Sequence, residues 1–148
     1  MEFRKTNKKD IPILMEMRKT QLIDEGGTPN EDINDGLIKF FNKRFDDQTL
    51  VQWVIEDNKE IVATAGIIFY ELPPSYSNIS GVKGYITNVY TKDAYRGQGL
   101  AKKLLNKLVE EAKSRNVKKL WLGASKMGRP VYEKFWFIEG DTWMEMDI

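Results

Sequence analysis

The strongest constraint on the fold is an amphipathic segment at residues 99–115 that follows a turn containing two glycines. Its apolar residues recur at the spacing of one helical face: Leu100, Ala101, Leu104, Leu105, Leu108, Val109 and Ala112. Apolar segments at 84–91 and 118–124 flank the predicted helix and are themselves predicted as strands. This order of a strand, a helix and a strand favours two parallel neighbours in one sheet, joined by a crossover helix.

The remaining segments predict a mixed sheet with helices on both faces. One helix is expected to begin after Asp10, its N-cap, and a second to span 31–45. Strands are predicted at 1–6, 50–55, 61–70 and, as one or two closing strands, within 137–148, with a short helix at 130–135. The expected fold class is α/β (α+β), a mixed central β-sheet flanked by helices, in a single domain over residues 1–148.

Composition and charge exclude several classes of function. The 148 residues carry a net charge of +1, from 23 basic and 22 acidic side chains, so neither nucleic acid nor a membrane is expected as a partner. No apolar run approaches the ~20 residues that a membrane span needs. Residues 1–10 lack the apolar stretch of a signal peptide, and we expect a cytoplasmic protein.

The chain contains no Cys and no His. A Cys–His or Ser–His–Asp nucleophile is therefore excluded, and a metal site is not expected. Any group transfer should be direct, without an intermediate in which an acyl group is bound to the enzyme.

Gly97 and Gly99 lie where the predicted strand passes into the amphipathic helix. Glycine permits positive φ angles and close approach of a ligand to the backbone. The first amides of the helix lack helical partners and, with the helix dipole, form an anion site. A Walker loop needs four residues between its glycines, and a dinucleotide fingerprint needs Gly or Ala where this chain has Lys102. The alternative to an anion site is an ordinary turn that uses glycine.

Two segments together resemble the motifs of the GNAT N-acetyltransferases. Residues 89–101, Val-Tyr-Thr-Lys-Asp-Ala-Tyr-Arg-Gly-Gln-Gly-Leu-Ala, resemble the acetyl-CoA motif Arg/Gln-x-x-Gly-x-Gly/Ala. Residues 125–137, Ser-Lys-Met-Gly-Arg-Pro-Val-Tyr-Glu-Lys-Phe-Trp-Phe, resemble the second motif, which commonly ends Tyr-Glu-Lys-Leu-Gly-Phe. The resemblance implies an acetyl-CoA-dependent N-acetyltransferase that acetylates a primary amine directly in a ternary complex and releases CoA.

The same resemblance implies roles for individual residues. The strand backbone at Val89, Tyr90 and Thr91 would pair with the pantetheine arm of acetyl-CoA. Ser125 would contact that arm, and Tyr132 would protonate the departing CoA thiolate. The implied pyrophosphate site comprises Arg96, Gly97, Gln98, Gly99, Leu100, Ala101 and Lys102.

The general base and the acceptor amine are less well defined by the sequence. Family members often place a Glu on the motif strand or its neighbours, but residues 85–91 contain no acid. Glu71 is our candidate base, and Asp24 and Glu25 are candidates for binding a cationic acceptor, which would be a small-molecule or peptide amine.

Two other functions stay open. Trp136 stands where the family usually has Gly, and this departure, with the missing strand acid, is compatible with a catalytically weak CoA-binding sensor or regulatory module. An interaction domain without a cofactor is the third alternative. An exposed terminal strand at 143–148 would offer an edge for a homodimer.

Overall fold

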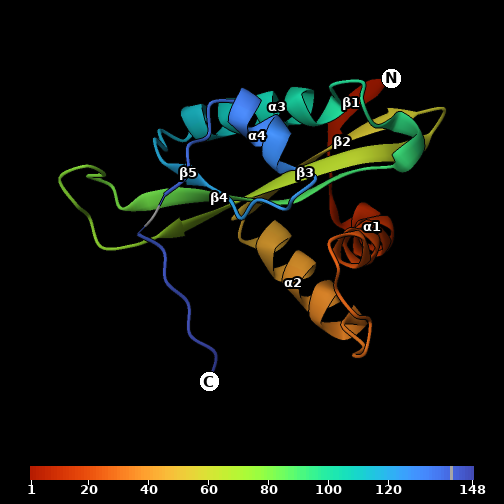
Figure 1. The fold of residues 1–148 in the computed structure, drawn as a ribbon, viewed down its shortest axis with the longest axis horizontal. Coiled ribbons are helices and arrows are strands. Elements are labelled where there is room, and N and C mark those ends of the chain that lie inside the picture. The colour runs from red at the N-terminus through yellow and green to blue at the C-terminus, as the bar shows by residue number, and fades with distance from the viewer. Residues whose placement is uncertain (141) are drawn as a thin grey trace.

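A mixed sheet lies between two layers of helices in the computed structural model, which describes residues 1–140 and 142–148 (Figure 1). Its described strands, in spatial order, are β1 (Glu2–Lys5), β2 (Leu50–Asp57), β3 (Glu60–Glu71), β4 (Val82–Thr91) and β5 (Leu120–Trp121). Strands β1 to β4 pair antiparallel, whereas β5 runs parallel to β4. The predicted mixed sheet and its parallel pair are confirmed.

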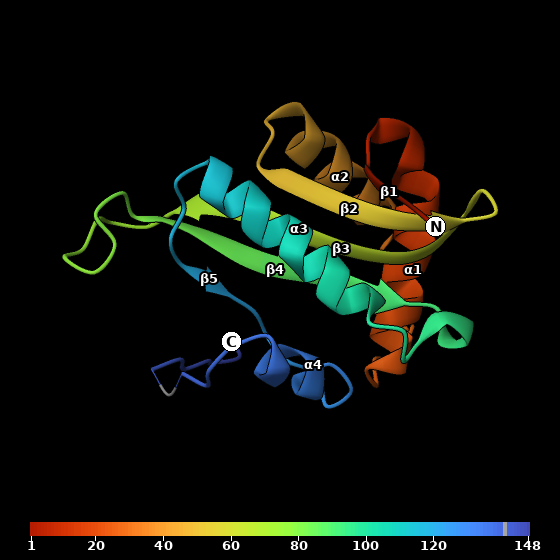
Figure 2. The same cartoon turned by 90° about the horizontal axis from the view of Figure 1, so that it is seen from above.

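Four helices cover the two faces of the sheet within the described residues (Figure 2). Helices α1 (Ile11–Asp24) and α2 (Asn34–Asp46) pack on one face, with Leu14, Phe41 and Val54 in their core. Helices α3 (Leu100–Ser114) and α4 (Arg129–Lys134) lie on the other face, over a core that includes Leu104 and Leu108. Burying such a side chain contributes roughly 1.5–3 kcal/mol to folding, so these two cores hold α1 and α3 in place against the sheet.

Asp10 anchors the start of α1 to the sheet. It lies at the N-cap position of α1, as predicted, but its carboxylate accepts from Asn7 N at 2.9 Å and so caps the preceding turn instead. Arg4 on β1 donates to both Asp10 oxygens, at 2.9 and 2.8 Å, and this contact lowers the pKa of Asp10. One end of α1 is therefore tied to β1.

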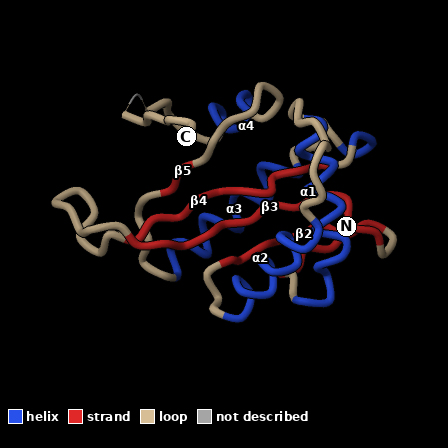
Figure 3. Tube along the Cα trace, turned by 90° about the horizontal axis from the view of Figure 1, so that it is seen from below, coloured by secondary structure: helices blue, strands red, loops and turns tan. Residues whose placement is uncertain are grey.

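Strand β5 leaves the sheet after two residues. The prediction placed a strand at 118–124, but pairing with β4 is limited to Gly84 with Leu120 and Tyr85 with Trp121. Beyond Trp121 the chain turns away from β4 toward α4 (Figure 3). Among the described residues, β4 from Ile86 to Thr91 therefore has a strand neighbour only on its β3 side.

The prediction of closing strands within 137–148 is wrong for the residues that the structure describes. Residues 138–140 and 142–148 form no strand, and no backbone hydrogen bond joins them to another described segment. Trp143 packs on Trp121, with ring centroids 4.4 Å apart. A strand needs a partner as well as suitable residues, and this segment contacts β5 through the Trp143 ring and not through backbone hydrogen bonds among the described residues. The expected terminal strand at a dimer edge is thus not formed.

Candidate active site

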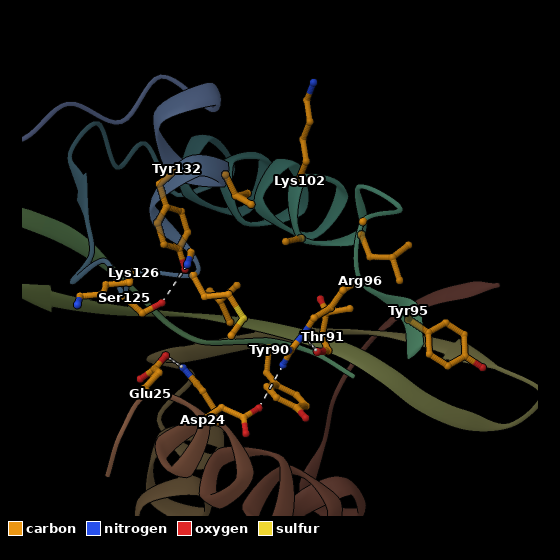
Figure 4. Close-up of a pocket in the computed structure, with 18 of the residues that line it drawn as sticks. Asp24, Glu25, Tyr90, Thr91, Tyr95, Arg96, Lys102, Ser125, Lys126 and Tyr132 are labelled. Atoms are coloured by element: carbon orange, nitrogen blue, oxygen red, sulfur yellow. Dashed lines mark hydrogen bonds and ion pairs between the residues drawn. The ribbon is translucent and has the colours of Figure 1, made fainter. Parts of the chain in front are cut away.

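A large cavity of about 830 Å³ opens at the end of β4, where β5 has left the sheet (Figure 4). It lies between the end of α1, the end of β4, the turn into α3, the loop at 125–128 and α4. The structure brings nearly all of the predicted site residues to this cavity: Val89, Tyr90, Thr91, Arg96, Gly97, Gly99, Leu100, Ala101, Lys102, Ser125 and Tyr132. Gln98 is exposed and does not line it.

A β-bulge shapes the cavity wall on β4. Thr64 pairs with Tyr90 and Gly66 pairs with Thr87, so two residues of β4, Asn88 and Val89, oppose a single residue of β3. Asn88 has a φ of 54°, and its buried side chain donates to Gln52 Oε1 at 3.1 Å. Bulges turn side chains and backbone groups out of their regular direction. Here the bulge lies directly before Tyr90 and Thr91, which line the cavity.

Side-chain hydrogen bonds to the neighbouring strands stabilise this bulge. Gln52 Nε2 donates to Thr64 Oγ1 at 2.8 Å, and Thr64 Oγ1 donates to the Trp53 carbonyl at 3.2 Å. Together with the bond from Asn88, this chain of contacts connects β4, β2 and β3. Buried polar groups of this kind stabilise one arrangement when each has a partner.

The turn into α3 provides backbone donors. Gly97 and Gly99 have φ angles of 77° and 75°, a region that favours glycine. Gly99 is the N-cap of α3 but has no side chain to cap its first amides. A Cβ atom at either glycine would meet nothing within 4 Å. The backbone at both glycines is therefore approachable, and the first amides of α3, which have no intrahelical acceptor and belong to residues that line the cavity, are available to a ligand anion.

Arg96 is held in place by several groups. Its Nε donates to the Thr91 carbonyl at 2.9 Å, and its guanidinium lies 3.2 Å from Asp24 and 2.6 Å from Asp93. Arg96 thus connects the end of α1 to the glycine turn. The side chain of Lys102 points away from the cavity (Figure 4), and the charge of Arg96 is already paired with two carboxylates.

The side chain of Tyr132 extends from α4 into the cavity toward Ser125 (Figure 4). Only 8% of it is exposed, and burial, together with the charges of Glu25 and Tyr85, raises its pKa to about 12. Its hydroxyl therefore stays protonated at neutral pH and can donate. Gly128 leaves room for the ring, because a Cβ there would lie 2.8 Å from Tyr132.

Comparison with known proteins identifies the family. The model of the acetyltransferase (GNAT) family matches residues 13–137. The chain belongs to this family. The chain is also similar to the crystal structure of a predicted acetyltransferase with acetyl-CoA from Clostridium acetobutylicum. The two are 49% identical, with a TM-score of 0.97, over 99% of this chain and 95% of that chain.

More distant relatives extend the comparison of this GNAT protein. A GCN5-related N-acetyltransferase from Ralstonia eutropha shares its fold, with 24% identity, a TM-score of 0.88 and coverage of 99% of this chain and 97% of that chain. Glucosamine 6-phosphate N-acetyltransferase from Trypanosoma brucei brucei is 31% identical over 88 residues. That match spans 60% of this chain and only 58% of the trypanosome enzyme.

The structure does not bring Glu71 to the cavity. Glu71 pairs with Val82 at the start of β4, at the opposite end of the strand from Tyr90, and it is exposed. Asp24 and Glu25, at the end of α1, do line the cavity. The register explains the difference, because antiparallel pairing puts the end of β3 beside the beginning of β4.

A small pocket of about 130 Å³ adjoins the large cavity along β4. Both are lined by Gln21, Glu25, Val89, Ser125 and Tyr132, and the small pocket also includes Arg18. Sequence reasoning missed Arg18 and Gln21. A signal existed for Gln21, which lies seven residues after Leu14, where the apolar face of the helix would otherwise continue.

Two further findings concern the described residues as a whole. No helix within residues 1–140 and 142–148 is long and apolar enough to cross a membrane. In the same ranges, no group of three or more His, Cys, Asp and Glu side chains is arranged to hold a metal ion.

Proposed function

We propose that this GNAT protein is an acetyl-CoA-dependent N-acetyltransferase that acetylates a primary amine directly, in a ternary complex. The proposal rests on one observation: the same cavity is lined by the uncapped amides at the start of α3 and by the protonated hydroxyl of Tyr132. The family membership supports the same reaction class.

The residues present fit acetyl-CoA. The free amides after Gly99 suit a pyrophosphate, since hydrogen bonds to a charged acceptor contribute roughly 1.5–3 kcal/mol each. The backbone of Val89 to Thr91 lacks a strand neighbour on the β5 side among the described residues, so it can pair with an extended arm. When bound there, acetyl-CoA would supply the acetyl group as a thioester, the species that reacts with an amine.

Tyr132 would act on the sulfur side of the reaction. Its Oη–H can donate a hydrogen bond where negative charge develops on the leaving thiolate. A free thiol has a pKa of ~8.5, well below the value of about 12 for Tyr132, so complete proton transfer is uphill. We therefore expect Tyr132 to assist departure without being indispensable.

Glu25 is better placed than Glu71 to act on the amine side. Its carboxylate lines both the large cavity and the small pocket, whereas Glu71 lines neither. An ammonium must lose one proton before its nitrogen can attack and a second as the C–N bond forms and the C–S bond breaks. One of these two protons ends on the sulfur of the CoA thiol, and the other is released to solvent. Glu25 would be the first acceptor of the proton released to solvent, directly or through water.

The experiment is a thiol-release assay with acetyl-CoA and a panel of amines. The panel should include amino acids, polyamines, peptide N-termini and glucosamine 6-phosphate, the acceptor named for the trypanosome relative. We expect release that depends on one class of amine, with the acetylated amine confirmed by mass spectrometry. Tight acetyl-CoA binding without release for any amine would instead favour a CoA-binding sensor.

Tyr132→Phe tests the role of the hydroxyl. We expect kcat to fall by about 10- to 100-fold, at or below the low end of the ~10²–10⁴-fold range for acid–base assistance, with the KM for acetyl-CoA nearly unchanged. Tyr76→Phe is the matched control, because Tyr76 is fully exposed and lines neither the cavity nor the pocket. Equal rates in the two variants would exclude a catalytic role for Tyr132.

A further inference from the structure

One polar face of α1 lines the small pocket. Arg18, Gln21 and Glu25 are spaced three and four residues apart, so they lie on the same side of the helix. Across the pocket are Thr87 and Asn88 of β4 and, from α4, Tyr132. The pocket thus combines a cation, an amide and a carboxylate along one helix.

Arg18 differs from the other arginines of the chain. It is half-buried, yet it makes no ion pair and no hydrogen bond to the residues that the structure describes. The other arginines each donate to a carboxylate, a hydroxyl or a carbonyl: Arg4, Arg44, Arg96, Arg115 and Arg129. A guanidinium that is partly withdrawn from water and faces a polar pocket is suited to bind an anion.

Gln21 carries a second unpaired group. It is only 8% exposed, and its Oε1 has no hydrogen-bond partner within residues 1–140 and 142–148. Its Nε2 donates to Glu25 Oε1 at 3.1 Å. Because a carboxylate only accepts, this bond fixes the amide orientation and leaves Oε1 as the free acceptor. Gln21 thus positions the Glu25 carboxylate beside the pocket, while its own enclosed oxygen has no partner among the described residues.

We propose that the acceptor is a small primary amine that also carries an anionic group, either a carboxylate or a phosphate. Arg18 binds the anionic group, and Glu25, held by Gln21, binds the ammonium beside Tyr132. This inference rests on the proposed function, because it assigns the small pocket to the acceptor of that reaction.

The dimensions of the pocket limit the acceptor. Arg18 and Glu25 are seven residues apart, about 10 Å along a helix axis, but both line the same small pocket, so the two ends of one small ligand can contact both. The volume of about 130 Å³ corresponds to roughly four waters at about 30 Å³ each. It accommodates the reacting end of a small metabolite more readily than a folded protein segment.

The experiment compares matched amines with and without the anion. The phosphate arm uses phosphoethanolamine against ethanolamine and glucosamine 6-phosphate against glucosamine. The carboxylate arm uses β-alanine against β-alaninamide. Binding to the protein–CoA complex is measured by calorimetry, and kcat/KM is measured separately by thiol release. We expect the anionic member of at least one pair to bind about 10- to 100-fold more tightly, the range for a charge-assisted hydrogen bond.

Variants assign this preference to Arg18. Arg18→Gln should abolish it by weakening only the anionic amines, and Arg18→Lys should restore part of it. Arg44→Gln removes the same charge from α2, where Arg44 contacts Thr49 and lines neither the cavity nor the pocket, and should keep the preference. Acetyl-CoA affinity and melting temperature check that each variant is folded.

The outcomes separate this inference from the proposed function. The inference is overturned if neutral and anionic members bind equally, if no anionic member binds, or if Arg18→Gln weakens both members alike. Selective binding of anionic amines without thiol release would support the acceptor site and contradict the enzymatic function. Thiol release that favours neutral amines would support the enzymatic function and contradict the anion-binding acceptor site.

Discussion

The large cavity and the small pocket meet at β4 but are built in different ways. The wall of the large cavity at β4 and α3 comes from one continuous stretch, residues 89–102, and it includes the uncapped start of α3 with its backbone amides. The small pocket combines side chains of α1, β4 and α4, from Arg18 to Tyr132, which are far apart in sequence. A backbone site depends on glycine and the helix start, whereas a side-chain site can change its ligand through single substitutions.

The largest effect should follow from closing the backbone site. Gly99→Val places a branched side chain at a φ of 75° and into the open space beside the first amides of α3. We expect acetyl-CoA affinity to fall by about 100-fold or more, through the loss of one or two hydrogen bonds to a charged acceptor. Calorimetric titration with acetyl-CoA measures this change.

Asn58→Val is the matched control for that substitution. Asn58 also has a positive φ, 50°, but lies in the β2–β3 hairpin turn and lines neither the cavity nor the pocket. Both variants should lose about 1–2 kcal/mol of stability from backbone strain. Equal acetyl-CoA affinity in the two variants would contradict a backbone anion site at Gly99.

A second test concerns the buried support of the bulge. Asn88→Ala removes the donor to Gln52 and leaves a less suitable residue at a φ of 54°. We expect the free energy of unfolding to fall by about 2–4 kcal/mol, from strain and an unpaired buried acceptor. Urea denaturation measures the loss. Asn42→Ala on α2, where the amide is exposed, should change stability by less than about 0.5 kcal/mol, and a comparable loss there would refute the role of the buried chain.

The pKa of Tyr132 predicts a specific alkaline instability. Burial raises the pKa to about 12 in the folded protein, above the ~10 of an unfolded tyrosine. In the folded protein the Tyr132 hydroxyl therefore stays protonated to a higher pH than in the unfolded chain. The resulting stabilisation is complete below pH 10 and is lost as the pH rises toward 12. The loss is about 2–3 kcal/mol for two pKa units. Urea unfolding at pH 9 and pH 12 should show a larger drop in the wild type than in Tyr132→Phe, which keeps only the loss from groups such as Tyr90 and Tyr95, whose pKa values are also raised. An equal drop in both proteins would contradict the prediction.

The smallest effect is expected at the link between α1 and the glycine turn. Asp24→Asn removes the partner 3.2 Å from Arg96, in a pair whose side chains are about one-third exposed. Such pairs contribute about 0.2–1 kcal/mol, so the KM for acetyl-CoA should rise by about two- to five-fold and the effect should diminish in high salt. Glu60→Gln breaks the exposed pair with Lys92 and should leave this KM unchanged. A large loss of stability in Asp24→Asn would mean that the pair is structural.

Local signals predicted local elements well. The helix expected at 99–115 is α3, Leu100–Ser114, and the one expected at 130–135 is α4, Arg129–Lys134. Their contacts lie within a few residues, and their apolar spacing or flanking Pro and Gly is visible in the chain. Strands were predicted less well at the C-terminal end. Only two residues of the stretch 118–124 pair with β4, because a strand exists only where another strand accepts its hydrogen bonds.

The candidate site also combines residues that local motifs predicted with residues that only packing between distant segments brings together. The glycine turn and Tyr132 were predicted from two motifs and line one cavity. Glu71 lies at the opposite end of the sheet from that cavity, since the register of β3 on β4 could not be derived from composition. Arg18 and Gln21 were missed, because a polar residue on a helix has no meaning for binding until the element packed against it is known.

The strand, the glycine turn and the amphipathic helix that follows could be predicted from the sequence alone, because each depends on residues close together in the chain. Those residues also carry the proposed anion site and the family resemblance. Three other features become visible only in the folded molecule: β5 leaves β4 after Trp121, α1 lies along the opening, and Glu25, unlike Glu71, lines the cavity with Tyr132. These features depend on packing between distant segments, and the free energy of that packing is not contained in any one of them.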